Sequence, residues 1–212
     1  MPRRLLGLTW PGSQHLTPLP PGACPSPKRG RSSTDGRGSP DMELLIVRHA
    51  IACERDAKRW PDDAGRPLSA PGITRARRAA AGLKRIAPRP GRVLTSPLTR
   101  ARQTAAILTE FAGWPKATTS SLLLPGASAE ALLTLLAGSG SPRCAVVGHE
   151  PDLSRLLANC LAGKAAGGAF EFRKMGVALV AFEGRPRAGH GELVWFVPPR
   201  LLRAARRRTE GR

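Results

Sequence analysis

Leu44-Leu45-Ile46-Val47-Arg48-His49-Ala50 is the stretch that decides the fold of this 212-residue chain. Its first four residues are apolar, and such a continuous run is typical of a strand buried on both faces, as in a parallel sheet beneath helices. Arg48 and His49 then lie at the carboxyl end of that strand, where open α/β sheets hold their ligands. The stretch therefore predicts both a sheet and the edge at which the chemistry takes place.

Working outward from this strand, helical and extended patterns alternate along the chain. Ser69 is a good N-cap for a helix that Pro88 ends, and Ser128 and Gly138 are suited to start and stop a later one. We expect helices over residues 70–87, 98–112, 129–137 and 153–161, the last capped by Asp152. We also expect strands over 92–95 and 144–147, and late antiparallel strands over 169–172, 177–182 and 192–197. This order predicts an α/β fold, a three-layer sandwich whose central, mostly parallel sheet carries helices on both faces.

The two ends of the chain differ in composition from its body. Residues 1–41 are rich in Pro, Gly, Ser and Arg and show no apolar period, so we expect a disordered N-terminal extension before a domain at 42–202 and a basic tail at 203–212. An Arg-rich, acid-poor composition is also found in transit peptides, and natural translation from Met42 is a simpler alternative.

Charge and cysteine content restrict the function further. The formal net charge is +19, of which roughly +11 lies in the body, and a basic body favours anionic ligands. The four cysteines form no C-x-x-C pair; Cys144 and Cys160 lie in apolar segments and are expected to be small buried hydrophobes. No stretch is long and apolar enough to span a membrane, so we expect a cytoplasmic protein.

Two of the predicted strands end in a histidine. His49 follows Val47-Arg48, and His149 follows Val147-Gly148, so both imidazoles reach one crevice if the strands are parallel neighbours. Arg100 opens the helix after the second strand, and Arg66 lies in the loop after the first. Histidines and arginines without an intervening carboxylate suit a dianion such as phosphate, toward which a neutral histidine is a competent nucleophile.

Four motifs in this order resemble the histidine phosphatase superfamily, with its phosphoglycerate-mutase-like fold, and most closely its SixA-type phosphohistidine phosphatases. They are Arg48-His49-Ala50, the segment 63–69 (DAGRPLS), the segment 96–105 (SPLTRARQTA) and the segment 147–151 (VGHEP). The resemblance covers residues 42–202. It implies a phospho-His49 intermediate, phosphoryl oxygens bound by Arg48, Arg66, Arg100 and His149, and neither cofactor nor metal.

One departure from that family bears on the substrate. Ester-cleaving members carry a general-acid Glu after the second helix, whereas Leu122 to Ser128 contains no carboxylate. Alkoxide leaving groups depend strongly on such an acid, and the imidazole of phosphohistidine depends on it less. The gap favours a phosphoramidate substrate, with Asp63 and Glu150 as possible substitutes for the acid.

The sequence leaves other functions open. The predicted function is removal of phosphate from a protein that bears phosphohistidine, for example a phosphotransfer domain. One alternative is a phosphatase of sugar or nucleotide phosphates, and another is a non-catalytic phosphate- or nucleic-acid-binding module. Aromatic residues are only 4% and Tyr is absent, so base stacking on nucleic acid is poorly supported. A metal held by His49, His149 and Asp63 is disfavoured by the arginines beside them.

Overall fold

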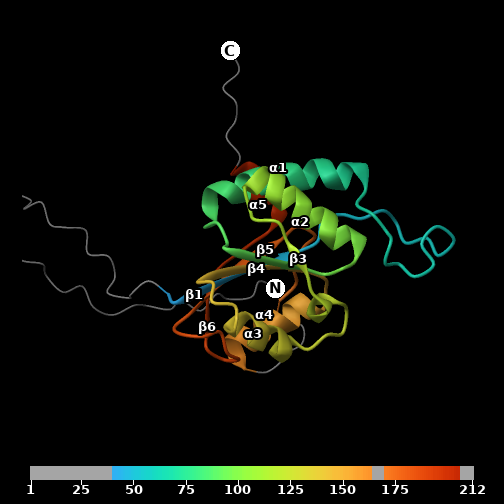
Figure 1. Ribbon diagram of the computed structural model, residues 1–212. Coiled ribbons are helices and arrows are strands. Elements are labelled where there is room, and N and C mark those ends of the chain that lie inside the picture. Colours follow the sequence, from blue (N-terminus) through green and yellow to red (C-terminus); the bar gives the residue numbers. More distant parts are fainter. Residues whose placement is uncertain (1–39, 164–169, 206–212) are drawn as a thin grey trace, which may run out of the picture. The chain divides into compact units, whose positions relative to one another are not determined.

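The computed structural model describes residues 40–163 and 170–205 (Figure 1). The predicted extension up to residue 39 and the tail from residue 206 lie outside the described residues. Within the described ranges no helix is long and apolar enough to cross a membrane. The elements in chain order are β1 (Met42–Arg48), α1 (Ala70–Ile86), β2 (Arg92–Thr95), α2 (Thr99–Ala112), β3 (Thr118–Thr119), the 3₁₀ turn η1 (Ser121–Leu123), α3 (Ala129–Ala137), β4 (Arg143–Gly148), α4 (Asp152–Ala162), β5 (Val177–Phe182), β6 (Gly191–Val197) and α5 (Pro199–Ala204).

The strands form one six-stranded sheet in the order β3-β2-β4-β1-β5-β6. The first four strands in this order are mutually parallel, β5 is antiparallel to its neighbour β1, and β6 is antiparallel to β5. Helices lie on both faces of the sheet, with α1, α2 and α5 on one side and α3 and α4 on the other (Figure 1). The predicted α/β sandwich with a mostly parallel central sheet is confirmed.

The buried strand β1 explains why its sequence is apolar without alternation. Leu45 and Val47 pack in the core beneath α1 and α2, and Leu44 and Ile46 pack in the core beneath α3 and α4. All four side chains are fully buried because each face of the sheet is covered. The second core also contains Cys144 and Cys160, which confirms the expectation that they are buried hydrophobes.

Three elements depart from the expected boundaries. Residues 170–172 are not a strand, because the backbone of Phe172 bonds to side chains of the site instead of to a neighbouring strand. Pro151 is the N-cap of α4, and Asp152 is its first helical residue. Helix α5 runs to Ala204, beyond the expected domain end at residue 202.

Helix α1 approaches the end of β1 closely at Gly72. The carbonyl oxygen of Ile51 would lie 2.0 Å from a Cβ at this position. That oxygen also accepts a hydrogen bond from the backbone N–H of Ser69, the N-cap of α1, so it is held in place. Only glycine allows the helix to start this close to the strand.

Gly72→Ala is therefore expected to destabilise the protein by about 1–3 kcal/mol or more, since the added methyl group meets a fixed backbone atom. Chemical denaturation of both proteins measures this loss. Gly138→Ala is the matched control, because a Cβ there meets nothing closer than 3.8 Å and the backbone φ is −84°. Equal destabilisation by the two substitutions would contradict the role of the close approach.

Candidate active site

Two histidines face each other at the carboxyl ends of neighbouring strands. Strands β1 and β4 are parallel with Arg48 opposite Gly148, so the next residue of each strand, His49 and His149, emerges at the same edge. Their ring centroids are 5.0 Å apart, and the side chains are only 7% and 4% exposed. The convergence expected from the sequence is therefore present.

The hydrogen bond of His49 fixes which of its nitrogens is reactive. Nδ1 lies 2.7 Å from the carbonyl oxygen of Ala50, and because a carbonyl can only accept, Nδ1 carries the proton. The neutral ring then has its lone pair on Nε2. An imidazole with a free Nε2 lone pair can attack phosphorus.

His149 is held through its other ring nitrogen, Nε2. Its Nε2 lies 2.9 Å from the hydroxyl oxygen of Ser96, which already accepts a hydrogen bond from the backbone N–H of Leu98. The hydroxyl proton of Ser96 remains free to donate to Nε2, and we assign the His149 proton to Nδ1 on this basis. Nδ1 is buried and has no hydrogen-bond partner among the described residues. It is available as a donor to an anion.

Both imidazoles are held neutral by their surroundings. The pKa of His49 is lowered to about 3, mainly by burial and further by the nearby His149, Arg100 and Arg48, against the Ala50 hydrogen bond. Burial likewise lowers the pKa of His149 to about 4, assisted by Arg100 and Arg48. The sequence argument relied on the arginines for this effect, but loss of solvent is the larger cause.

These depressed pKa values predict loss of stability in acid. The unfolded chain binds protons below about pH 6.5 while the folded imidazoles resist them, so stability falls as the pH drops toward the folded pKa values. From pH 6.5 to pH 4.5 each histidine is expected to cost about 2 kcal/mol. Denaturation at pH 7 and pH 4.5 should show a smaller drop for His149→Gln than for wild type, whereas His190→Gln, at an exposed turn, should match wild type. An unchanged drop in His149→Gln would refute this assignment.

Two arginines lie beside the histidines, Arg100 buried and Arg48 half-buried. Arg48 donates from its terminal nitrogen to the carbonyl of Phe172, and Arg100 donates to the carbonyl of Asp63 at 3.0 Å. The Nε atoms of both arginines are buried without a partner among the described residues. Together with Nδ1 of His149, three buried nitrogens around His49 can still bind oxygens. Helix α2 also starts here, which adds a favourable field for an anion.

The loop between β1 and α1 brings Asp63 and Arg66 to this edge. Asp63 accepts from Arg66 at 2.6 Å and pairs with Arg100 at 3.3 Å, while Arg66 also donates to the carbonyl of Cys53 at 2.7 Å. The hydrogen bond from Arg66 lowers the pKa of Asp63, with further lowering by Arg100. An ionised Asp63 orients two arginines, which fits this position better than the acid role considered from the sequence.

Glu150, the other possible acid, contacts the backbone instead of the histidines. Its carboxylate accepts from the hydroxyl of Ser154 at 2.8 Å and from the backbone N–H of Phe172 at 2.6 Å. Since Phe172 in turn accepts from Arg48, Glu150 positions Arg48 through this residue. No sequence pattern indicates the role of Phe172, because a backbone carbonyl is available at every residue.

The segment 96–105 contributes three further residues to the site besides Arg100. Ser96 contacts His149, the side-chain oxygen of Gln103 accepts from the N–H of Leu68 at 2.7 Å, and Thr104 accepts from the N–H of Ala50 at 3.0 Å. Sequence reasoning assigned no role to Ser96, Gln103 or Thr104. Their presence in the same motif as Arg100 was the one sequence feature that could have indicated these roles.

The region where an ester-cleaving enzyme would carry its acid contains η1 and the loop to Ser128. The carboxylate that contacts it comes from α4, where Asp152 accepts from the backbone N–H of Gly126 at 3.0 Å. Asp152 also pairs with Arg155 at 3.3 Å. Asp152 is thus a third carboxylate to test, in addition to Asp63 and Glu150.

Residues that could hold a metal do not gather in the described parts of the chain. Over residues 40–163 and 170–205, no group of three His, Cys, Asp or Glu side chains is arranged to bind an ion. The site gathers cationic and imidazole groups, which suit a tetrahedral anion directly.

Comparison with known proteins agrees with this geometry. The model of the histidine phosphatase superfamily (branch 1) matches residues 44–123, which carry the first three motifs. No curated protein matches the sequence. The matched segment and the fold together confirm the resemblance to the histidine phosphatase superfamily.

Solved structures show which proteins of this fold the chain resembles. The protein histidine phosphatase SixA in complex with tungstate is 27% identical, with a TM-score of 0.66, over 76% of this chain and 99% of that one. SixA from Agrobacterium tumefaciens shares the fold at 22% identity and a TM-score of 0.60, over 74% and 98% of the two chains. A mycobacterial glucosyl-3-phosphoglycerate phosphatase shares it at 17% identity and a TM-score of 0.58, over 74% and 99%. The chain is therefore SixA-like within a fold that also serves other phosphatases.

Proposed function

We propose that this protein is a phosphohistidine phosphatase that removes phosphate from protein phosphohistidine through a phospho-His49 intermediate. The observation that carries the proposal is the free Nε2 of His49, surrounded by the unpaired nitrogens of Arg48, Arg100 and His149. A nucleophile among donors that still lack partners is the arrangement that phosphoryl transfer requires.

The chemistry follows from these groups. Nε2 of His49 attacks phosphorus, a new N–P bond forms, and the P–N bond to the substrate imidazole breaks as that imidazole takes up a proton from solvent. Water then attacks phospho-His49 and releases inorganic phosphate, which restores the imidazole. Arg48, Arg100 and Nδ1 of His149 bind the oxygens on which charge is spread, and Arg66 is proposed to join them by moving with its loop.

The substrate class rests on the leaving group. Asp63 is ionised and Glu150 is occupied by three donors, so neither is placed to protonate an alkoxide. An imidazole leaving group needs less help. The 27% identical relative, called a protein histidine phosphatase and complexed with the oxyanion tungstate, supports the same class.

A second candidate is hydrolysis of small phosphate esters, such as sugar or nucleotide phosphates. It is favoured by one observation, since a glucosyl-3-phosphoglycerate phosphatase has the same fold. The donor set binds the phosphoryl group alike in both candidates, so the two differ only in the leaving group. A non-catalytic module would have no use for the free nucleophile of His49.

The direct test is hydrolysis of a phosphohistidine-bearing polypeptide, with release of inorganic phosphate measured in the presence of EDTA. We expect turnover without added metal, because the proposed donors are all protein nitrogens. Sugar phosphates and phosphoserine peptides are run beside it. Turnover of those esters at an equal or higher rate would favour the second candidate, and loss of activity to EDTA with recovery on adding a divalent ion would refute metal independence.

A further inference from the structure

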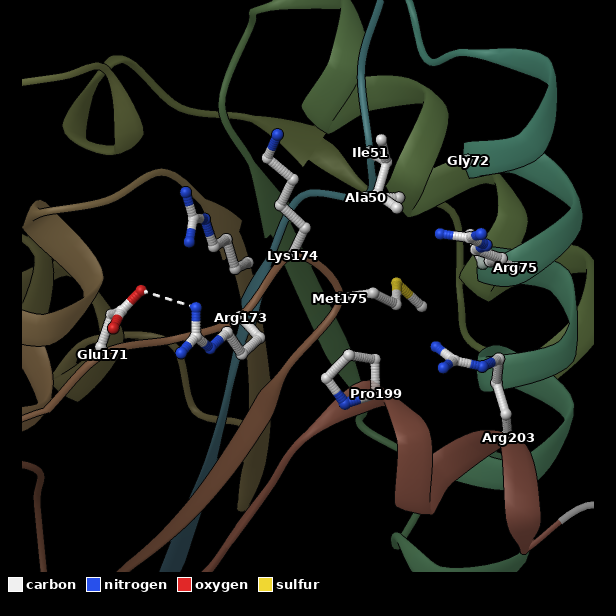
Figure 2. A pocket seen from close by; sticks show the side chains of 12 residues that line it. Ala50, Ile51, Gly72, Arg75, Glu171, Arg173, Lys174, Met175, Pro199 and Arg203 are labelled. Carbon is white, nitrogen blue, oxygen red and sulfur yellow. Dashed lines mark ion pairs between the residues drawn. The ribbon is translucent and has the colours of Figure 1, made fainter.

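A cavity lies beside the histidines. It has a volume of about 510 Å³ and is bounded by α1, α5, the end of β1 and the turn that precedes β5 (Figure 2). Arg48 and Ala50, the two neighbours of His49 in the sequence, line it, but His49 itself does not. The cavity thus adjoins the proposed site of phosphoryl transfer without being part of it.

The floor of this cavity is apolar and is bonded to the catalytic segment. Ala50 and Met175 are 1% and 3% exposed, and Ile51 and Pro199 complete the floor. The backbone N–H of Met175 lies 3.1 Å from the carbonyl of Arg48 and 3.2 Å from that of His49. A group seated on Met175 is therefore held next to the nucleophile.

The rim of the cavity is strongly cationic. Arg75 extends from α1 and Arg203 from α5 toward Met175 and Pro199, while Arg173 and Lys174 lie on the opposite side (Figure 2). Of these four, only Arg173 has a recorded carboxylate partner among the described residues, Glu171 at 3.4 Å, and both members of that pair are well exposed. The remaining cations are free to bind anions from outside.

We propose that this cavity binds an acidic segment of the phosphohistidine-bearing protein, with an apolar side chain on the floor and flanking carboxylates on the rim. This rests on the proposed function and extends it to the choice of partner. Arg75 and Arg203 on one side, and Arg173 and Lys174 on the other, bind carboxylates at two positions of one chain, while the site beside them holds the phosphoryl group.

An acidic polypeptide fits this cavity better than a small dianion does. Arg75, Arg173 and Lys174 are exposed, whereas a small ligand is usually fixed by a few convergent buried polar groups. The apolar floor would also be left without a partner by a second phosphate group. A chain segment with both apolar and acidic side chains satisfies floor and rim together.

The experiment compares the double variant Arg75→Gln/Arg203→Gln with the control Arg85→Gln/Arg200→Gln. The control removes two exposed arginines from the same helices α1 and α5, at positions that do not line the cavity. The substrates are phosphohistidine peptides with acidic or with neutral flanks. For the cavity variant we expect KM for the acidic peptide to rise roughly tenfold at unchanged kcat, as two partly exposed charge pairs allow. The control and the neutral peptide should show no such change.

A binding measurement with an unphosphorylated acidic peptide separates this proposal from the proposed function. Weaker binding to the cavity variant than to the control supports the cavity even if phosphohistidine proves not to be the substrate. Equal KM changes in both double variants, or no preference for acidic flanks in wild type, would overturn it. Tighter binding of inorganic pyrophosphate than of the acidic peptide in the cavity would also overturn it, because that result would indicate a small phosphate anion as the ligand.

Discussion

His49→Ala is expected to abolish nearly all turnover, by about 10⁴-fold or more, while the fold remains. No other described group of the site is placed to replace the nucleophile, since Nε2 of His149 is bonded to Ser96, the carboxylates of Asp63 and Glu150 are held by other donors, and the arginines are cations. The side chain lies at the end of β1 and not in the two cores, so its removal leaves the packing of the sheet intact. Steady-state kinetics with an aryl phosphate and circular dichroism measure the two outcomes.

His190→Ala is the control for this variant, because His190 is exposed in the turn before β6. A rapid quench with ³²P-labelled substrate should trap an acid-labile, base-stable phosphate on wild type and none on His49→Ala. His149→Ala should still form that adduct, although more slowly, because it loses a donor to the phosphoryl oxygens and not the nucleophile. Phosphate trapped on another residue of wild type would refute phospho-His49.

The second large effect concerns the leaving group. We expect kcat/KM for phosphohistidine to exceed that for sugar phosphates and phosphoserine by about 10²–10⁴, the usual contribution of a general acid. The kcat/KM for aryl phosphates should be close to that for phosphohistidine, because aryl leaving groups depart with little protonation. The measurement is one kcat/KM series across leaving groups of increasing pKa, and a steep decline toward alkyl esters is the expected form.

Three carboxylate variants complete that series. Asp63→Asn, Glu150→Gln and Asp152→Asn each remove one carboxylate that lies at or near the site. If none acts as the acid, each changes the rates for all leaving groups by a common factor. A variant that lowers only the alkyl rates would identify an acid and would promote the small-ester candidate.

The elements could be predicted from sequence because local signals and burial agree there. The apolar run of β1, the N-cap Ser69 and the stop at Gly138 each determine their structure through neighbours in the chain. The convergence of His49 and His149 followed from one rule, that parallel strands end at the same edge. Residues 170–172 were predicted as a strand from composition, and long-range bonds from Glu150 and Arg48 prevent it.

The remaining parts of the site depend on contacts that no local pattern encodes. The position of Arg48 is set by the carbonyl of Phe172, at a distance of 124 residues in the chain. The sequence suggested Asp63 as a possible general acid, whereas in the structure its carboxylate binds two arginines from different elements and orients them. The cationic cavity likewise needs α1, α5 and the turn before β5 to be brought together.

Helix α2 and the turn before it contact the site at four points, with Ser96 on His149, Arg100 on Asp63, Gln103 on Leu68 and Thr104 on Ala50. The nine residues 96–104 therefore connect both histidine-bearing strands to the intervening loop. A partly folded chain in which α2 is detached would lack all of these contacts at once. Enzymatic activity should consequently vanish together with the unfolding transition in denaturant, without a folded but inactive intermediate.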